Sequence, residues 1–202
     1  MSILNVIRDA TTGLLASVEA RKQTPTGNAL NVQIGPGDVV SNIPVIIDFE
    51  HHQIHEGESY LAQDIQSSIG TSTVKYSITV PTFATTINSP HMIIVCDVYN
   101  GNATVSVYES ATFTGGSTVT IYNRNRNSAT TAGTTIKTGI TSTNGTLIKT
   151  FYAGAGKSTS GSSRSETEIV LKSNTIYRID IVGRSAGTEA IVGFLFYEDL
   201  GV

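Results

Sequence analysis

Short strand-forming stretches follow one another from residue 45 to the end of the chain, and they constrain the fold more than any other feature. Val74–Val80 alternates apolar and polar side chains up to Pro81, which is typical of a half-buried strand. Met92–Tyr99 is apolar except for Asp97, as expected of a strand buried on both faces. The other expected strands are Ala103–Tyr108, Ser117–Tyr122, Thr135–Ile140, Leu147–Tyr152, Glu168–Leu171, Ile176–Val182 and Ala190–Tyr197.

Turn residues between these stretches indicate how the strands are joined. Asn-Gly pairs favour the tight turns of hairpins, so Asn100-Gly101 and Asn144-Gly145 predict two β-hairpins. Gly154–Ser165 is expected to be a long, mobile Gly/Ser loop. Strands at this spacing predict an all-β fold, and we expect an antiparallel, jelly-roll-like β-sandwich over residues 46–202.

The first 45 residues differ from the rest, because they contain few large apolar side chains and show no sustained period. Such a segment cannot form a core alone. Two alternatives remain: an extended N-terminal arm that contacts another subunit, or a local β-hairpin of the main domain. The apolar residues expected to make the arm's contacts are Leu14, Leu15, Val18, Leu30, Val32 and Ile34.

Composition excludes several classes of function. A net charge of -3 leaves no basic surplus to bind nucleic acid. Cys96 is the single cysteine and lies in an apolar run, so we expect a buried, inert thiol and no disulfide. No apolar run approaches the roughly 20 residues of a membrane span. No signal peptide is visible, and we expect a soluble product made in the cytoplasm.

The stretch Ile46–Ile65 holds the densest group of ionisable side chains, and we expect it to be the first strand of the domain. On a strand, His51 and His55 would share a face about 13 Å apart, and His52 would point the opposite way. A helix would bring His51 and His55 together, but the neighbouring Gly and β-branched residues do not favour one. A single chain is therefore not expected to bind metal here, although a symmetric trimer could gather one histidine from each copy.

Three motifs resemble catalytic or ligand-binding sites without completing one. Gly183–Gly187 matches G-x-S-x-G, but a strand follows it and every histidine precedes the serine, so we interpret it as a hairpin turn. Ala155–Ser158 lacks the first glycine of a phosphate-binding loop. Glu56 and Glu58 would share a strand face at a glycosidase-like spacing, but the chain has no tryptophan to line a sugar groove. We therefore expect no enzyme and no cofactor.

The polar stretch Asn123–Ser128 contains two cations, Arg124 and Arg126. It is suited to binding carbonyl or carboxylate groups of a neighbouring chain. It could equally be a solvated connection between strands.

Four segments together resemble small virion proteins of tailed bacteriophages. They are His51–Gly57, Asn123–Ser128, Phe194–Glu198, and an N-terminal pair formed by Asp9–Val18 and Gly27–Val32. The resemblance covers most of the chain in separated patches. One departure is Phe196, at a position where the family often has tryptophan.

The resemblance implies a non-enzymatic virion protein. Its most specific form is a trimeric capsid decoration (cement) protein on the capsid surface, whose arm binds the major capsid protein. The alternative is a head-fibre, tail-fibre or tail-tip module that binds host surface glycans through Asn123–Ser128 and Gly154–Ser165. The expected partner-binding residues are the six apolar arm residues together with His51, His55, Arg124 and Arg126.

Overall fold

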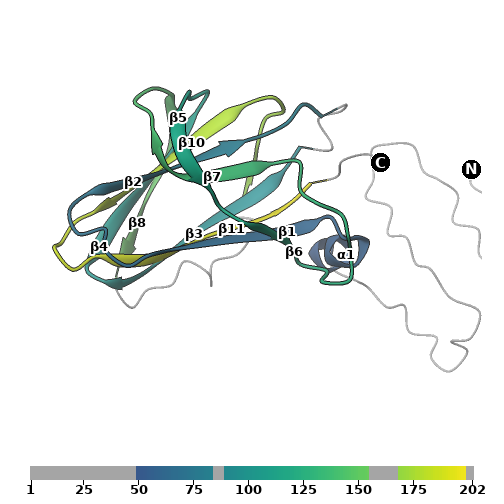
Figure 1. Cartoon of the computed structure of the whole chain (residues 1–202), viewed down its shortest axis with the longest axis horizontal. Helices are drawn as coiled ribbons and strands as arrows, with labels where there is room; N and C mark the ends of the chain where they lie inside the picture. Colours follow the sequence, from purple (N-terminus) through teal and green to yellow (C-terminus); the bar gives the residue numbers. More distant parts are fainter. Residues whose placement is uncertain (1–48, 84–88, 155–167, 199–202) are drawn as a thin grey trace, which may run out of the picture. The chain divides into compact units, whose positions relative to one another are not determined.

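The computed structural model describes residues 49–83, 89–154 and 168–198, and they form two antiparallel β-sheets packed against each other (Figure 1). The predicted arm over residues 1–45, its six apolar contact residues and most of the Gly154–Ser165 stretch lie outside this part of the chain. The described part holds no helix long and apolar enough to cross a membrane.

One sheet has five strands and the other has six. In spatial order, the first consists of β6 (Ile121–Asn123), β1 (Ser59–Gln66), β11 (Glu189–Tyr197), β3 (His91–Asn100) and β9 (Ile169–Val170). The second consists of β5 (Thr114–Thr118), β7 (Thr135–Thr141), β2 (Thr73–Thr79), β10 (Ile176–Gly183), β4 (Asn102–Glu109) and β8 (Thr146–Gly154). A single helix, α1 (Phe49–Glu56), precedes them in the described residues.

The strand pairing is that of a jelly roll. β1 pairs with β11, β2 with β10, β3 with β9 and β4 with β8, as in a long two-stranded ribbon folded at its middle. Rolling this ribbon up brings β11 beside β3 and β10 beside β4. The remaining strands, β5, β6 and β7, are inserted between β4 and β8 and extend the sheet edges. The expected all-β sandwich is therefore confirmed.

The core lies between the two sheets because each strand directs alternate side chains inward. In β11, Val192, Phe194 and Phe196 are at most 1% exposed, which confirms the predicted alternation of the last strand. Tyr76 of β2 meets Phe194 edge to face, with ring centroids 5.5 Å apart. Aromatic side chains from both sheets thus interlock in one core.

Both predicted Asn-Gly hairpins are wrong. Asn100-Gly101 carries the chain from β3 in one sheet to β4 in the other, and Asn144-Gly145 joins β7 and β8, which are not neighbours. The turn Gly183–Gly187 likewise connects β10 and β11 in opposite sheets rather than closing a hairpin. Most consecutive strands of a jelly roll lie in different sheets, so the turns at Asn100-Gly101 and Gly183–Gly187 pair no neighbouring strands. β7 and β8 share a sheet, but β2, β10 and β4 lie between them. Ser117–Tyr122, expected to be one strand, is divided between β5 and β6 in different sheets.

Candidate functional site

The stretch expected to be the first strand begins as a helix. α1 covers Phe49–Glu56, and the strand β1 starts only at Ser59. Two helical turns are marginal on their own in water, so α1 depends on its surroundings for stability. The stabilising contacts are hydrogen bonds at the C-terminus of α1, and some of them come from residues far away in the sequence. The residues of α1 alone therefore did not predict a helix.

Gly57 terminates α1 in a Schellman motif. Its N–H donates to the oxygen of Ile54 (3.2 Å), and the Glu58 N–H donates to the oxygen of Gln53 (3.0 Å). Gly57 has φ +80°, a left-handed conformation that favours glycine. A Cβ atom there would also lie 2.4 Å from Oγ of Ser128. Gly57 was therefore a usable sequence signal for a helix end.

The polar stretch Asn123–Ser128 completes the cap from a distant part of the chain. The side-chain amide of Asn125 donates to the oxygen of His55 (3.0 Å), and that of Asn123 donates to the oxygen of Gly57 (2.7 Å). Asn123 also donates to the oxygen of Thr130 (3.0 Å). Of the two alternatives for this stretch, the structure shows binding to carbonyl groups, but they belong to the same chain.

The two arginines in this stretch have different environments. Arg124 is half-buried, and its main-chain N–H and Nη1 donate to the O and Oγ of Ser59 at 2.8 and 3.3 Å. Arg126 is exposed, and its guanidinium lies 5.3 Å from the centroid of the Tyr122 ring. Arg126 is thus the more accessible of the two guanidinium groups.

The end of β11 joins the same region. The Glu198 N–H donates to the oxygen of Glu58 (3.1 Å), and the Glu198 side chain is 1% exposed. Its carboxylate accepts hydrogen bonds from the main-chain N–H groups of Gly133 and Thr134 and from the Thr134 hydroxyl. Burial raises the pKa of Glu198, and these hydrogen bonds partly oppose the rise. The carboxylate therefore has a structural role, fixing the connection before β7 to the end of β11.

We call residues 49–60, 122–134 and 196–198 the α1 corner. In Figure 1 it lies where α1 meets the ends of β1 and β6. The segments His51–Gly57, Asn123–Ser128 and Phe194–Glu198 meet here or lead directly into it. Segments that are far apart in the sequence thus form one structural unit.

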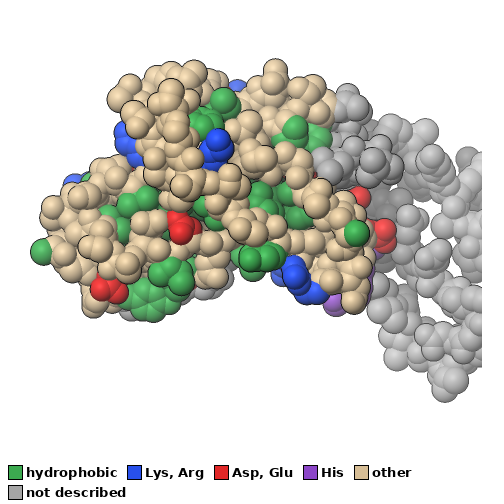
Figure 2. Space-filling view, viewed as in Figure 1, with side chains coloured by type: hydrophobic (Ala, Val, Ile, Leu, Met, Phe, Trp, Pro, Cys, Tyr) green, Lys and Arg blue, Asp and Glu red, His purple; other side chains and the backbone are tan. Residues whose placement is uncertain are grey.

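The histidines of the α1 corner are arranged differently from the expectation. Nε2 of His51 and Nε2 of His55 lie 3.2 Å apart, not about 13 Å, because one helical turn separates them. His52 is on another side of the helix, with its Nε2 3.7 Å from Oε1 of Glu56. Histidine and basic side chains are exposed at this end of the described surface (Figure 2).

The expected acidic pair is also wrong, because Glu56 ends α1 and Glu58 lies between α1 and β1, so they share no strand face. Within residues 49–83, 89–154 and 168–198, no three His, Cys, Asp or Glu side chains are close enough together to hold a metal ion.

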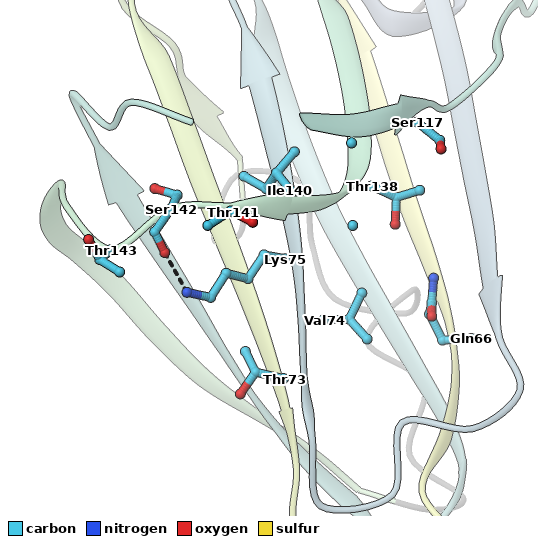
Figure 3. Close-up of a pocket in the computed structure, with 12 residues that line it drawn as sticks. Gln66, Thr73, Val74, Lys75, Ser117, Thr138, Ile140, Thr141, Ser142 and Thr143 are labelled. Atoms are coloured by element: carbon cyan, nitrogen blue, oxygen red, sulfur yellow. Dashed lines mark hydrogen bonds between the residues drawn. The ribbon is translucent and has the colours of Figure 1, made fainter. Parts of the chain in front are cut away.

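A second feature is an open hollow of about 770 Å³ beside β1, β2, β5 and β7 (Figure 3). Its lining has no carboxylate, histidine or cysteine, and Lys75 donates to the main-chain oxygen of Ser142. The hollow can offer hydrogen bonds to a polar ligand but carries no acid–base pair. Its hydroxyl side chains are Thr73, Ser117, Thr138, Thr141, Ser142 and Thr143.

Buried charges elsewhere support the fold. On β10, Nε of Arg178 lies 2.9 Å from Oδ1 of Asp180, and both side chains are buried. Arg178 also stacks on the Tyr108 ring at 3.8 Å and donates to the main-chain oxygen of Asn144. Burial raises the pKa of Asp180, while the positive charge of Arg178 opposes the rise. With Lys75, Arg178 thus fastens the connection from β7 to β8 onto this sheet.

Cys96 and Ser185 are in structural positions. Cys96 is fully buried in β3, as predicted, and burial raises the pKa of its thiol to about 12. Oγ of Ser185, in the Gly183–Gly187 turn, lies 3.1 Å from Oγ1 of Thr188.

No protein-family model, curated protein or solved structure matches this chain.

Proposed function

We propose that this chain is a non-enzymatic structural protein of a tailed-phage virion, in its most specific form a capsid decoration protein. The observation that carries the proposal is the α1 corner. The segments resembling phage virion proteins are joined there by hydrogen bonds of Asn123, Asn125 and Glu198. A resemblance spread over separate patches gains weight when those patches build a single unit.

The fold is consistent with this proposal. Jelly rolls occur in viral capsid proteins, although lectin domains and cupins share the architecture, so fold alone does not decide function. Charged side chains of β10 are engaged in holding the sheet together, and the hollow carries no acid–base pair. These features favour a structural role, in which the protein binds other subunits through its surface, over an enzymatic one.

One edge strand offers an apolar contact surface. β8 pairs only with β4, so its other edge is free among the described strands. Tyr152 is 80% exposed, and Leu147 and Ile148 of the same strand are 53% and 43% exposed. Hydrophobic side chains also reach the surface at other places (Figure 2). We propose β8 as a contact between copies in a homotrimer, while the arm, residues 1–45, binds the major capsid protein.

The test uses the full-length chain and undecorated capsids. Replacing Leu30, Val32 and Ile34 with serine should abolish co-pelleting with capsids, because these apolar side chains would make the arm's contacts. Replacing Thr24 and Thr26 with serine is the matched control and should leave binding intact. Full capsid binding by the triple variant would refute the arm mechanism.

A second function, recognition of host surface glycans by a fibre or tail module, is favoured by the hollow with its six hydroxyl side chains. Under this proposal, the protein should bind host polysaccharide, and Thr138→Val combined with Thr141→Val should weaken that binding. Ser106→Ala is a control outside the hollow lining. Absence of polysaccharide binding by the parent protein would remove this second function.

A further inference from the structure

The exposed histidine pair of α1 holds two imidazole nitrogens within hydrogen-bonding distance of each other. His51 and His55 are four positions apart, and their Nε2 atoms lie 3.2 Å from each other. The rings are inclined at 39°, with centroids 4.7 Å apart. Both side chains are exposed, so an ion can reach them from solvent.

The distance between the two nitrogens suits a transition-metal ion. Zinc–imidazole bonds are about 2.0–2.1 Å long. With both Nε2 atoms bound to one ion at that length, the Nε2–metal–Nε2 angle would be roughly 100–106°. That angle lies between the right angle of an octahedral site and the tetrahedral angle. Histidines at positions i and i+4 on one helix face are also the spacing by which H-E-x-x-H helices hold zinc.

The chain offers no better imidazole or thiol ligand set. Its four histidines and one cysteine all lie in the described residues. His52 pairs with Glu56, His91 lies 3.4 Å from Glu168 and stacks on Tyr197, and Cys96 is buried.

We propose that His51 and His55 together bind one divalent transition-metal ion of the zinc, nickel or cobalt class, with water in the remaining positions. Imidazole nitrogen is a preferred ligand of these ions. The residue after His51 is His52 rather than glutamate, so the general base of the zinc proteases is missing. The site therefore binds metal without hydrolytic chemistry.

Binding would stabilise α1. An ion held by side chains on successive turns fixes the helix, and a ligand that binds only the folded form raises its stability. Because α1 has only eight residues, a metal ion that links His51 to His55 would restrain most of the helix.

The test is a titration of the full-length protein with Zn²⁺, followed by the melting temperature, with Co²⁺ absorption as a second readout. We expect Zn²⁺ to raise Tm in the parent and in His52→Ala, and the shift to vanish in His51→Ala and in His55→Ala. His52→Ala is the matched control, since it removes an exposed histidine of the same helix outside the pair. Unchanged Tm values without metal would show that the variants fold.

Three results would overturn the proposal. One is a parent protein that does not respond to Zn²⁺ or Co²⁺. Another is a Tm shift lost equally in His52→Ala, which would indicate unspecific binding to surface histidines. The third is a Zn²⁺-dependent increase in the mass of the protein in solution, which would assign the site to ligands shared between copies.

Discussion

The side-chain amide of Asn125 donates a 3.0 Å hydrogen bond to the main-chain oxygen of His55, 70 positions earlier in the chain. This bond and that from Asn123 to Gly57 satisfy carbonyl groups at the end of α1 that the helix itself leaves without partners. A loop between β6 and β7 thereby stabilises a helix that precedes β1. The α1 corner should consequently respond as a unit to mutation.

Gly57→Ala should destabilise the protein by roughly 1–3 kcal/mol, because alanine is strained at φ +80° and its Cβ would clash with Oγ of Ser128. Urea unfolding measures the loss. Gly187→Ala is the control, since a Cβ there would meet nothing within 4 Å. Equal stabilities of the two variants would contradict the role of Gly57.

Asn123→Ala should cost about 1–3 kcal/mol of unfolding free energy, because the buried oxygen of Gly57 would lose its hydrogen-bond donor. Hydrogen exchange should show faster opening of α1 amides in this variant. Asn127→Ala, at an exposed position of the same loop, should change stability by less than about 0.5 kcal/mol. If the amide protons of α1 exchanged in Asn123→Ala at the same rate as in the parent, the proposed role of Asn123 in capping the helix would be contradicted.

Glu198→Gln should change how stability depends on pH. Burial raises the pKa of Glu198 in the folded protein, so between the ordinary and the raised pKa the folded state binds more protons than the unfolded state. The unfolding free energy of the parent should therefore fall as pH rises through this window, and Glu198→Gln should lack this contribution. The stability of the variant relative to the parent should thus increase with pH.

Urea unfolding at a series of pH values measures this difference. Glu189→Gln, at an exposed position, is the control. A constant difference between parent and Glu198→Gln across the window would show that Glu198 has the same proton affinity in both states.

Arg178→Met should destabilise the protein by about 3–5 kcal/mol, because it removes the ion-pair partner of the buried Asp180 and leaves Lys75 as its positive neighbour. Adding Asp180→Asn should recover part of this loss, since the buried negative charge disappears. Arg184→Met is the control: Arg184 is exposed, and its Nε donates to Oγ1 of Thr104. Thermal unfolding of the single and double variants measures the coupling, and purely additive losses would argue against it.

Sequence patterns predicted the positions of the strands better than they predicted which strands pair with each other. The alternation in β11 reports burial, which is a local property. The expectation that β3 is buried on both faces was wrong in part, because Ile93 is only partly buried and Tyr99 is 60% exposed. The Asn-Gly pairs predicted reversals, but in a jelly roll the flanking strands usually belong to different sheets, so a turn does not specify pairing. Pairs such as β4 with β8 depend on the whole ribbon, including the inserted strands.

The candidate site was predictable only in part. The cluster of histidines was evident, but its geometry depends on a helix whose cap comes from Asn123 and Asn125. The eight residues of α1 alone show too weak a helical pattern to favour a helix over a strand, so the helix could not be predicted without knowing its contacts with that loop. Gly57 and, in the last helical turn, His55 were the local signals of a helix end.

The most direct test of the proposed function is the mass of the purified full-length protein in solution, followed by its co-pelleting with undecorated capsids. A decoration protein should be a stable trimer that pellets with the capsids at a fixed ratio to the major capsid protein. A folded protein that stays in the supernatant at every ratio would contradict the proposal and favour the fibre or tail module.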